Sequence, residues 1–108
     1  MKRVGEGAES VGTADERRKA LYQAVVGLKS VEECERFFED LCTPTEVEAM
    51  ADRWLVAGLV DRGVPYREIH DRTGVSTATV TRVGRALKLG ADGYRLALGR
   101  LARKGRKR

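Results

Sequence analysis

The sequence has few of the residues that metal sites, disulfide frameworks and membrane spans require. Its 108 residues include two cysteines, two prolines, one tryptophan and one histidine. A single histidine, and cysteines as far apart as Cys34 and Cys42, argue against a zinc site, so we expect reduced cysteines within a helical core. No apolar run approaches the roughly 18 residues of a membrane span and no secretory signal is present. We therefore expect a cytoplasmic protein.

The sequence also lacks the arrangements on which enzymes depend. It has no pairing of a nucleophile with a base, no phosphate-binding glycine loop and no set of metal ligands, so we expect no enzyme and no cofactor. Runs of β-branched residues are scarce, whereas Ala, Leu, Arg and Glu are abundant, which favours an all-α fold. The length allows one domain with short segments at each end.

The charge is distributed unevenly along the chain. The formal net charge is only +5, and positive and negative residues are mixed over the first 64 residues. From residue 65 onward the only acidic residues are Glu68, Asp71 and Asp92. The cations of the same part are Arg67, Arg72, Arg82, Arg85, Lys88, Arg95, Arg100, Arg103, Lys104, Arg106, Lys107 and Arg108. This asymmetry predicts a polyanionic partner for the second part of the chain, although a role in solubility alone is the alternative.

Two helices are predicted in the first part of the chain. Residues 1–13 contain three glycines and little apolar content, and we expect them to be a disordered leader. The first helix is expected from Asp15 to Leu28 and the second from Val31 to Leu41. Their apolar positions at helical spacing are Leu21, Ala24, Val25 and Leu28, and then Val31, Cys34, Phe38 and Leu41.

The next segment carries a strong signal for the start of a helix. Thr43 can cap, Pro44 suits the first helical position, and Glu46 closes a capping box. We expect this helix to be the longest, to end at Arg62 before Gly63, and to be central, with other helices packed around it. Its predicted apolar stripe is Val47, Met50, Ala51, Trp54, Leu55 and Gly58.

Residues 65–89 read as two short helices joined by a turn. Pro65 opens the first helix at 65–72, Gly74 supplies a turn residue with positive φ, and Ser76 caps the second helix at 77–89. Its expected inward positions are Val80, Val83, Gly84 and Leu87, and Gly90 ends it. A last helix at 92–103 should carry Tyr94, Ala97, Leu98 and Leu101 on one face, and 103–108 should be a solvated basic tail.

The second helix of this pair offers a polar face suited to the major groove of DNA. Threonine can bond a base or a phosphate, alanine allows close approach, and arginine can grip guanine or a phosphate. Helical spacing groups such residues on one face: Thr77, Ala78, Thr81, Arg82 and Arg85. The first helix of such motifs crosses the DNA backbone, so Arg67 and His70 are candidates for phosphate contacts. The alternative is a solvated polar face on a helical hairpin.

Five segments, in order, resemble one family. They are LCTPTE at 41–46, ADRW at 51–54, REI at 67–69, GVSTATVTRV at 74–83 and LKLGADGY at 87–94. From about Leu21 to Leu101 the chain thus resembles the Trp repressor superfamily, most closely its YerC/YecD-type, Trp-repressor-related branch. The resemblance implies a six-helix subunit with a helix-turn-helix and an intertwined homodimer built largely from the N-terminal helices.

The resemblance also implies functional positions. The DNA-contacting positions of the family fall on Arg67, His70, Thr77, Ala78, Thr81 and Arg82. Its tryptophan pocket matches Thr43, Arg53 and Arg82. However, Val83 stands where the repressor has a glycine that leaves space for the indole ring, and Ala86 replaces a serine near the ligand's amino group. We therefore do not expect tryptophan as corepressor.

Three functions remain open from the sequence. The leading one is a dimeric, sequence-specific transcription regulator that binds double-stranded DNA, in the role of a repressor. A variant of it is gated by a small effector other than tryptophan, bound near Arg53 and Arg82, through a shift in conformational populations. The third is a helical protein-interaction module. Salt discriminates between these classes, because a DNA-binding protein loses affinity steeply as the salt concentration rises.

Overall fold

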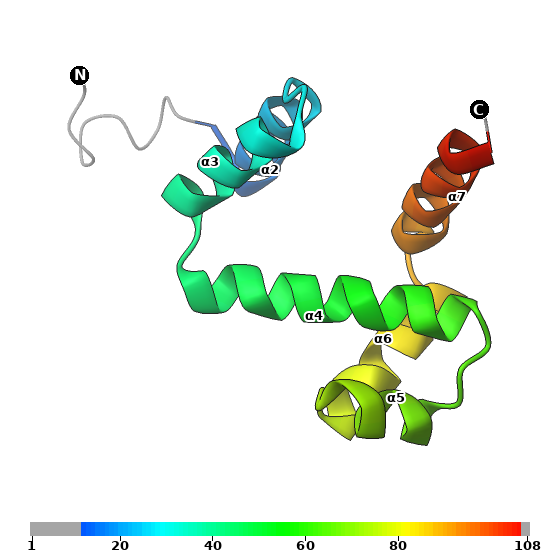
Figure 1. Ribbon diagram of the computed structural model, residues 1–108. Coiled ribbons are helices and arrows are strands. Elements are labelled where there is room, and N and C mark those ends of the chain that lie inside the picture. The colour runs from blue at the N-terminus through cyan, green and yellow to red at the C-terminus, as the bar shows by residue number, and fades with distance from the viewer. Residues whose placement is uncertain (1–11, 107–108) are drawn as a thin grey trace. The chain divides into compact units, whose positions relative to one another are not determined.

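The structure is a computed structural model that describes residues 12–106, and every regular element among them is an α-helix (Figure 1). Contacts divide the chain into two units, residues 1–42 with α2 and α3, and residues 43–108 with α4 to α7. The helices are α2 (Ala14–Val26), α3 (Val31–Leu41), α4 (Pro44–Asp61), α5 (Tyr66–Thr73), α6 (Thr77–Leu89) and α7 (Gly93–Arg106). The predicted all-α subunit of six helices is thereby confirmed.

The first helix begins at a capping box that the sequence analysis missed. The Thr13 hydroxyl accepts a hydrogen bond from the Glu16 N–H at 3.1 Å, and the Glu16 carboxylate accepts one from the Thr13 N–H at 2.8 Å. Each side chain thus satisfies a backbone donor that the start of a helix leaves unpaired. Thr13 therefore belongs to the helix start and not to the predicted leader at 1–13, of which residues 1–11 lie outside the described part.

The end of α2 also differs from the prediction, whereas α3 has its predicted bounds. Helix α2 ends at Val26 and not at Leu28, and the Leu28 N–H bonds the Val25 carbonyl, only three residues back, at 3.1 Å. Ser30 then caps α3 through the backbone N–H of its third residue. The two helices are therefore separated by a short connection that closes one helix and starts the next.

Neither helix of the first unit contains a buried residue. The predicted apolar positions are only half-buried or exposed: Leu21, Ala24, Val25, Leu28, Val31, Cys34, Phe38 and Leu41. Cys34 and Cys42 are half-buried free thiols, so the prediction of core cysteines is wrong for the isolated chain. Helices in proteins are stabilised mainly by packing of an apolar face, and neither face is buried by the described residues of this unit.

Helix α4 starts as predicted. The Thr43 hydroxyl accepts from the Glu46 N–H at 3.1 Å, the Glu46 carboxylate accepts from the Thr43 N–H at 2.8 Å, and Pro44 occupies the first turn. The helix ends at Asp61, one residue before the predicted Arg62, and Gly63 follows with φ +85°. Local sequence signals therefore set both ends of this helix.

The buried face of α4 is not the predicted one. Its buried residues are Val56, Ala57 and Leu59. The members of the predicted stripe are half-buried or exposed: Val47, Met50, Ala51, Trp54, Leu55 and Gly58. Helix α4 is apolar on more than one side, so periodicity alone could not say which side the rest of the chain covers. Trp54 is 38% exposed and is not a core residue of the chain alone.

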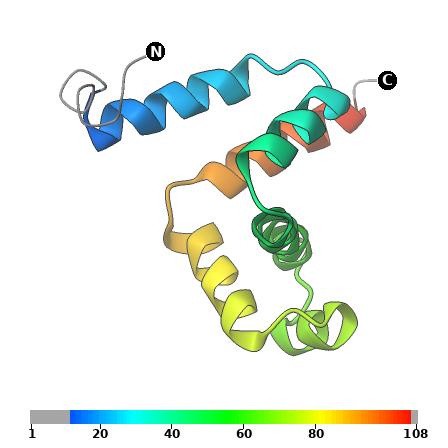
Figure 2. The same ribbon diagram turned by 90° about the vertical axis from the view of Figure 1, so that its left-hand side faces the viewer.

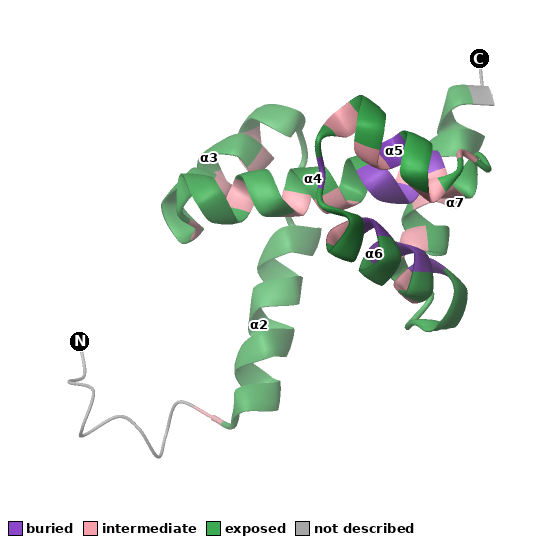
Figure 3. Ribbon diagram, turned by 90° about the horizontal axis from the view of Figure 1, so that it is seen from below, coloured by how far each residue is buried: buried purple, intermediate pink, exposed green. Residues whose placement is uncertain are grey.

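The second unit has one compact core, formed where α4, α5 and α6 meet. Figure 2 looks down the axis of α4, with α6 beside it, and Figure 3 shows the buried residues gathered on these three helices. The core residues are Val56, Ala57, Leu59, Ile69, Val75, Val80 and Val83. Burial of each larger side chain contributes about 1.5–3 kcal/mol, which holds α5 and α6 against α4.

Helix α7 is longer than predicted. It runs to Arg106, so the first residues of the predicted tail at 103–108 are helical, and residues 107–108 lie outside the described part. Arg and Lys are good helix formers, and their charge does not end a helix. Of the predicted inward positions Tyr94 and Leu98 are half-buried, while Ala97 and Leu101 are exposed.

Gly74 should be the least replaceable turn residue. Its φ of +77° lies in the left-handed region, so Gly74→Ala should lower the free energy of unfolding by about 1–2 kcal/mol, measured by urea denaturation. Gly105→Ala is the control, because Gly105 lies within α7 and a Cβ there would have no neighbour within 4 Å among the described residues. It should raise stability by up to about 1 kcal/mol. Equal effects at the two glycines would contradict this account of the turn.

Candidate nucleic-acid interface

The turn between α5 and α6 is held by side chains as well as by its backbone. The Gly74 N–H bonds the His70 carbonyl at 2.9 Å, in the left-handed conformation predicted for a turn glycine. The Thr73 hydroxyl donates to the Ile69 carbonyl at 2.7 Å and accepts from the Val75 N–H at 3.1 Å. These bonds fix the direction in which the chain leaves α5, and hence where α6 begins.

Two further side chains complete the turn. Ser76 caps α6 as predicted, because its hydroxyl accepts from the Thr79 N–H at 3.1 Å. The His70 Nδ1 lies 2.7 Å from the Val75 carbonyl oxygen. A carbonyl only accepts, so Nδ1 carries the proton and donates it. The remaining ring nitrogen, Nε2, is then directed away from this bond and can contact a ligand.

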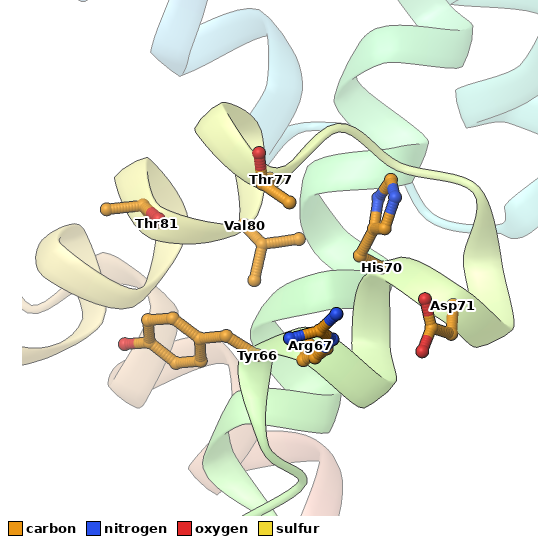
Figure 4. Close-up of a pocket in the computed structure, with 7 residues that line it drawn as sticks. All are labelled: Tyr66, Arg67, His70, Asp71, Thr77, Val80 and Thr81. Atoms are coloured by element: carbon orange, nitrogen blue, oxygen red, sulfur yellow. The ribbon is translucent and has the colours of Figure 1, made fainter.

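A hollow of about 460 Å³ lies between α5 and α6 (Figure 4). It is lined by Tyr66, Arg67, His70, Asp71, Thr77, Val80 and Thr81. Val80 forms its floor, since this side chain is only 1% exposed and belongs to the core. The rim is polar and comes from both helices, so a ligand seated here would contact α5 and α6 together.

A second, shallower hollow of about 470 Å³ lies along the outer side of α6. Its lining residues are Thr77, Ala78, Thr81, Arg82 and Arg85, which are the five residues predicted to face DNA from this helix. Thr77 and Thr81 line both hollows, so the two form one continuous surface, which we call the α5–α6 face. All seven predicted DNA-binding residues lie on it, Arg67 and His70 on α5 and the rest on α6.

The α5–α6 face carries more positive than negative charge. Arg67, Arg82 and Arg85 are exposed, and none of them takes part in an ion pair within residues 12–106. The only carboxylate on the lining is Asp71. Arginines that are free of internal partners keep all their donors for a ligand, and their planar heads match phosphate and guanine.

Two lining residues were missed by the sequence analysis, Tyr66 and Asp71. Each lies on the side of α5 that carries the two predicted residues, because Tyr66 is four residues before His70 and Asp71 is four residues after Arg67. Helical spacing from the predicted pair could therefore have found both.

The residues of the predicted effector site do not line one shared hollow, unlike the predicted DNA-binding residues. The Thr43 hydroxyl is engaged in capping α4, and Arg53 is half-buried along that helix. Only Arg82 of the three lines one of the hollows described above, and it does so on the outer side of α6. The structure therefore does not bring Thr43, Arg53 and Arg82 to one of these cavities.

Val83 and Ala86, the two residues that differ from the family's tryptophan pocket, lie in different surroundings. Val83 is 1% exposed and packs in the core. Ala86 lines a third cavity of about 340 Å³ together with Tyr94 and two residues before it, Ala91 and Gly93. The Trp54 ring stacks on Tyr94, with centroids 6.4 Å apart.

Metal sites and membrane-spanning helices were also sought within residues 12–106. They contain no group of three or more His, Cys, Asp and Glu side chains placed to hold a metal ion. No helix in the same part of the chain is both long and apolar enough to span a membrane.

Comparison with known proteins gives consistent relatives. The sequence matches the family described as Trp repressor protein over residues 16–102. It is 46% identical over 81 residues to the uncharacterized protein YerC of Bacillus subtilis, covering 75% of this chain and 78% of that protein. It is 41% identical over 56 residues to a Trp operon repressor homolog of Actinobacillus succinogenes, covering 51% of this chain and 55% of that protein.

A solved structure agrees with these sequence matches. The crystal structure of a TrpR-like protein from Eubacterium eligens superposes with a TM-score of 0.77 at 37% identity, covering 87% of this chain and 95% of that chain. The family match covers most of the chain, and the fold agrees over nearly the same extent. The chain belongs to the Trp repressor family.

Proposed function

We propose that this protein is a transcription regulator that binds double-stranded DNA through α5 and α6 as a helix-turn-helix, and that it acts as a repressor. The observation that carries the proposal is the α5–α6 face, where three exposed arginines without ion-pair partners flank two threonines and an alanine. Major-groove reading needs this combination of short hydroxyl side chains and long cations on one helix. Family membership supports the proposal, and the name of one relative includes operon repression.

The residues of this face take different roles in the proposal. Thr77, Ala78 and Thr81 lie in the first two turns of α6, which enter the groove first, and they contact base edges. Arg82 reaches a base edge or a phosphate from the same helix. On α5, Arg67 and His70 contact the phosphate backbone and set the register of α6 on the duplex. The His70 Nε2 must carry a proton in this contact, because a phosphate oxygen only accepts.

Removal of Arg82 tests this assignment. Arg82→Ala should weaken binding to a duplex enriched from random-sequence DNA by about 1–3 kcal/mol, measured by fluorescence anisotropy, because a base contact is lost. The matched control is Arg72→Ala. Arg72 is also an exposed arginine of the helix-turn-helix, but it bonds Glu68 at 3.2 Å and lines neither hollow. Arg72→Ala should lower the affinity for DNA only by the small amount expected from the loss of one positive charge outside the interface.

The same titration separates the alternatives. Log affinity should fall steeply and linearly with log salt concentration, as released counterions require. Equal losses in the two arginine variants would show that Arg82 has no special place in the interface. Weak binding that does not depend on salt would favour the protein-interaction module.

We further propose that the DNA-binding form is a homodimer. In the described chain no residue of α2 or α3 is buried, and the apolar stripe of α4 is uncovered as well. Exposed large apolar side chains on these helices include Leu21, Tyr22, Val25, Val26, Val31, Leu41, Trp54 and Leu55. A second copy that covers these faces would bury them, and a symmetric dimer also matches two half-sites on DNA.

A lysine placed in the apolar face of α2 tests the dimer. Val25→Lys should shift sedimentation at micromolar concentration from a dimer toward a monomer, because the buried ammonium would have no partner. Gln23→Lys adds the same charge to the same helix, but residues two apart point in different directions, so it should remain dimeric. A wild-type protein that sediments as a monomer would overturn this part of the proposal.

Regulation by tryptophan is not part of the proposal. Val83 is buried in the core, and the family resemblance aligns it with a position where the family's pocket needs open space. An effector of another kind, bound near Arg53 and Arg82, remains the alternative function.

Addition of free tryptophan tests this point. Millimolar tryptophan should leave the affinity for the enriched duplex unchanged, because its ring has no slot beside Val83. The measurement is the same anisotropy titration with and without the amino acid. A rise in affinity would show that the pocket exists in the assembled protein and that Val83 does not fill it.

A further inference from the structure

Gly84 occupies an unusual place within α6. It is buried in the middle of a helix whose backbone there is ordinary, so no special φ explains a glycine. In the interior of a helix, glycine lowers stability more than any other residue except proline. Its presence is explained by space, since a Cβ at this position would overlap the Tyr66 hydroxyl and lie 2.5 Å from Tyr66 Cζ.

The Tyr66 ring is therefore seated directly on the backbone of α6. It is half-buried and packs against the core cluster, and the Lys88 ammonium lies 5.8 Å from its centroid. Lys88 is one turn beyond Gly84, so the ring lies over one short stretch of α6. Figure 4 shows the ring reaching from the start of α5 toward α6.

This contact joins parts of the two helices that the turn does not join. The turn at Gly74 connects the end of α5 to the start of α6, whereas Tyr66 is the first residue of α5 and Gly84 lies in the second half of α6. Core side chains such as Ile69 and Val80 already hold the two helices against α4, and the Tyr66 contact adds a point of attachment that constrains the angle between them. Tyr66 also lines the hollow beside Thr77 and Thr81.

We propose that Tyr66 is a positioning residue, which, seated on Gly84, sets the angle of α6 to α5 and hence the presentation of Thr77 and Thr81 to a duplex. The inference rests on the proposed DNA-binding function. The hydroxyl itself makes no DNA contact in this proposal. Its ring acts through α6, so the size of residue 84 and the size of residue 66 must be matched.

A cycle of variants tests the match: Gly84→Ala, Tyr66→Ala, the double variant, and Tyr66→Phe. The readout is the ratio of affinities for the enriched duplex and for a scrambled duplex at one salt concentration. Gly84→Ala and Tyr66→Ala should each lower this ratio by about tenfold, the loss of one good base contact. The double variant should lose no more than either single variant, because removal of the ring removes the overlap.

Two controls separate positioning from general damage. Tyr66→Phe keeps the ring and should keep the ratio. Gly105→Ala adds a methyl group within α7, where no described atom lies within 4 Å, and should keep the ratio as well. Losses that multiply in the double variant, or a loss in Tyr66→Phe equal to that in Tyr66→Ala, would overturn the proposal. If Tyr66→Ala does not fold, Tyr66→Val replaces it in the cycle.

The free protein provides a readout that needs no DNA. In amide spectra, Gly84→Ala should shift the Thr77 and Thr81 resonances in the wild-type background but not in the Tyr66→Ala background. Shifts that are equal in both backgrounds, or absent in both, would overturn the coupling. If the variants show this coupling but the wild-type protein does not bind DNA, the proposed function is overturned and the coupling is not.

Discussion

The packing of α5 and α6 on the C-terminal half of α4 is the interaction on which the rest of this structure depends. Ile69, Val80 and Val83 are each at most 1% exposed, and they meet Val56 and Ala57 of α4, which are fully buried. The opposite sides of α5 and α6 can then be polar, because the apolar sides are satisfied. The α5–α6 face is thus a consequence of where the core lies.

Much of this arrangement is encoded locally and could be predicted. The capping box at Thr43, the left-handed Gly74 and the Ser76 cap each act over a few residues, and the structure has all three. The seven predicted DNA-binding residues come together on one face because helical spacing and a fixed turn are enough to place them. Their contact with DNA remains a prediction.

Other features depend on contacts that are distant in sequence. Periodicity identified an apolar stripe on α4 but not which side the core uses, because Val56 and Leu59 are as apolar as Met50 and Leu55. The pairing of Tyr66 with Gly84 links residues that only the folded turn brings together. Helix α7 continued past Arg103 because nothing in the basic segment ends a helix.

In the account proposed here, the chain is one half of a dimer, and its exposed apolar faces are where the two copies meet. Among residues 12–106 no side chain of α2 or α3 is buried, and the predicted stripe of α4 is half-buried or exposed, whereas α5 and α6 pack on α4 through buried side chains. In the account proposed here, the first set of surfaces joins two copies and the second contacts DNA. Trp repressor itself is a helix-turn-helix dimer, and such dimers contact half-sites about 34–36 Å apart.

The most direct test of this account is selection of bound fragments from genomic DNA by the purified protein, at two salt concentrations. The account predicts a palindromic site whose half-sites lie one helical turn apart, with retention that falls steeply at the higher salt concentration. Absence of any enriched site, with or without cell extract to supply an effector, would contradict it.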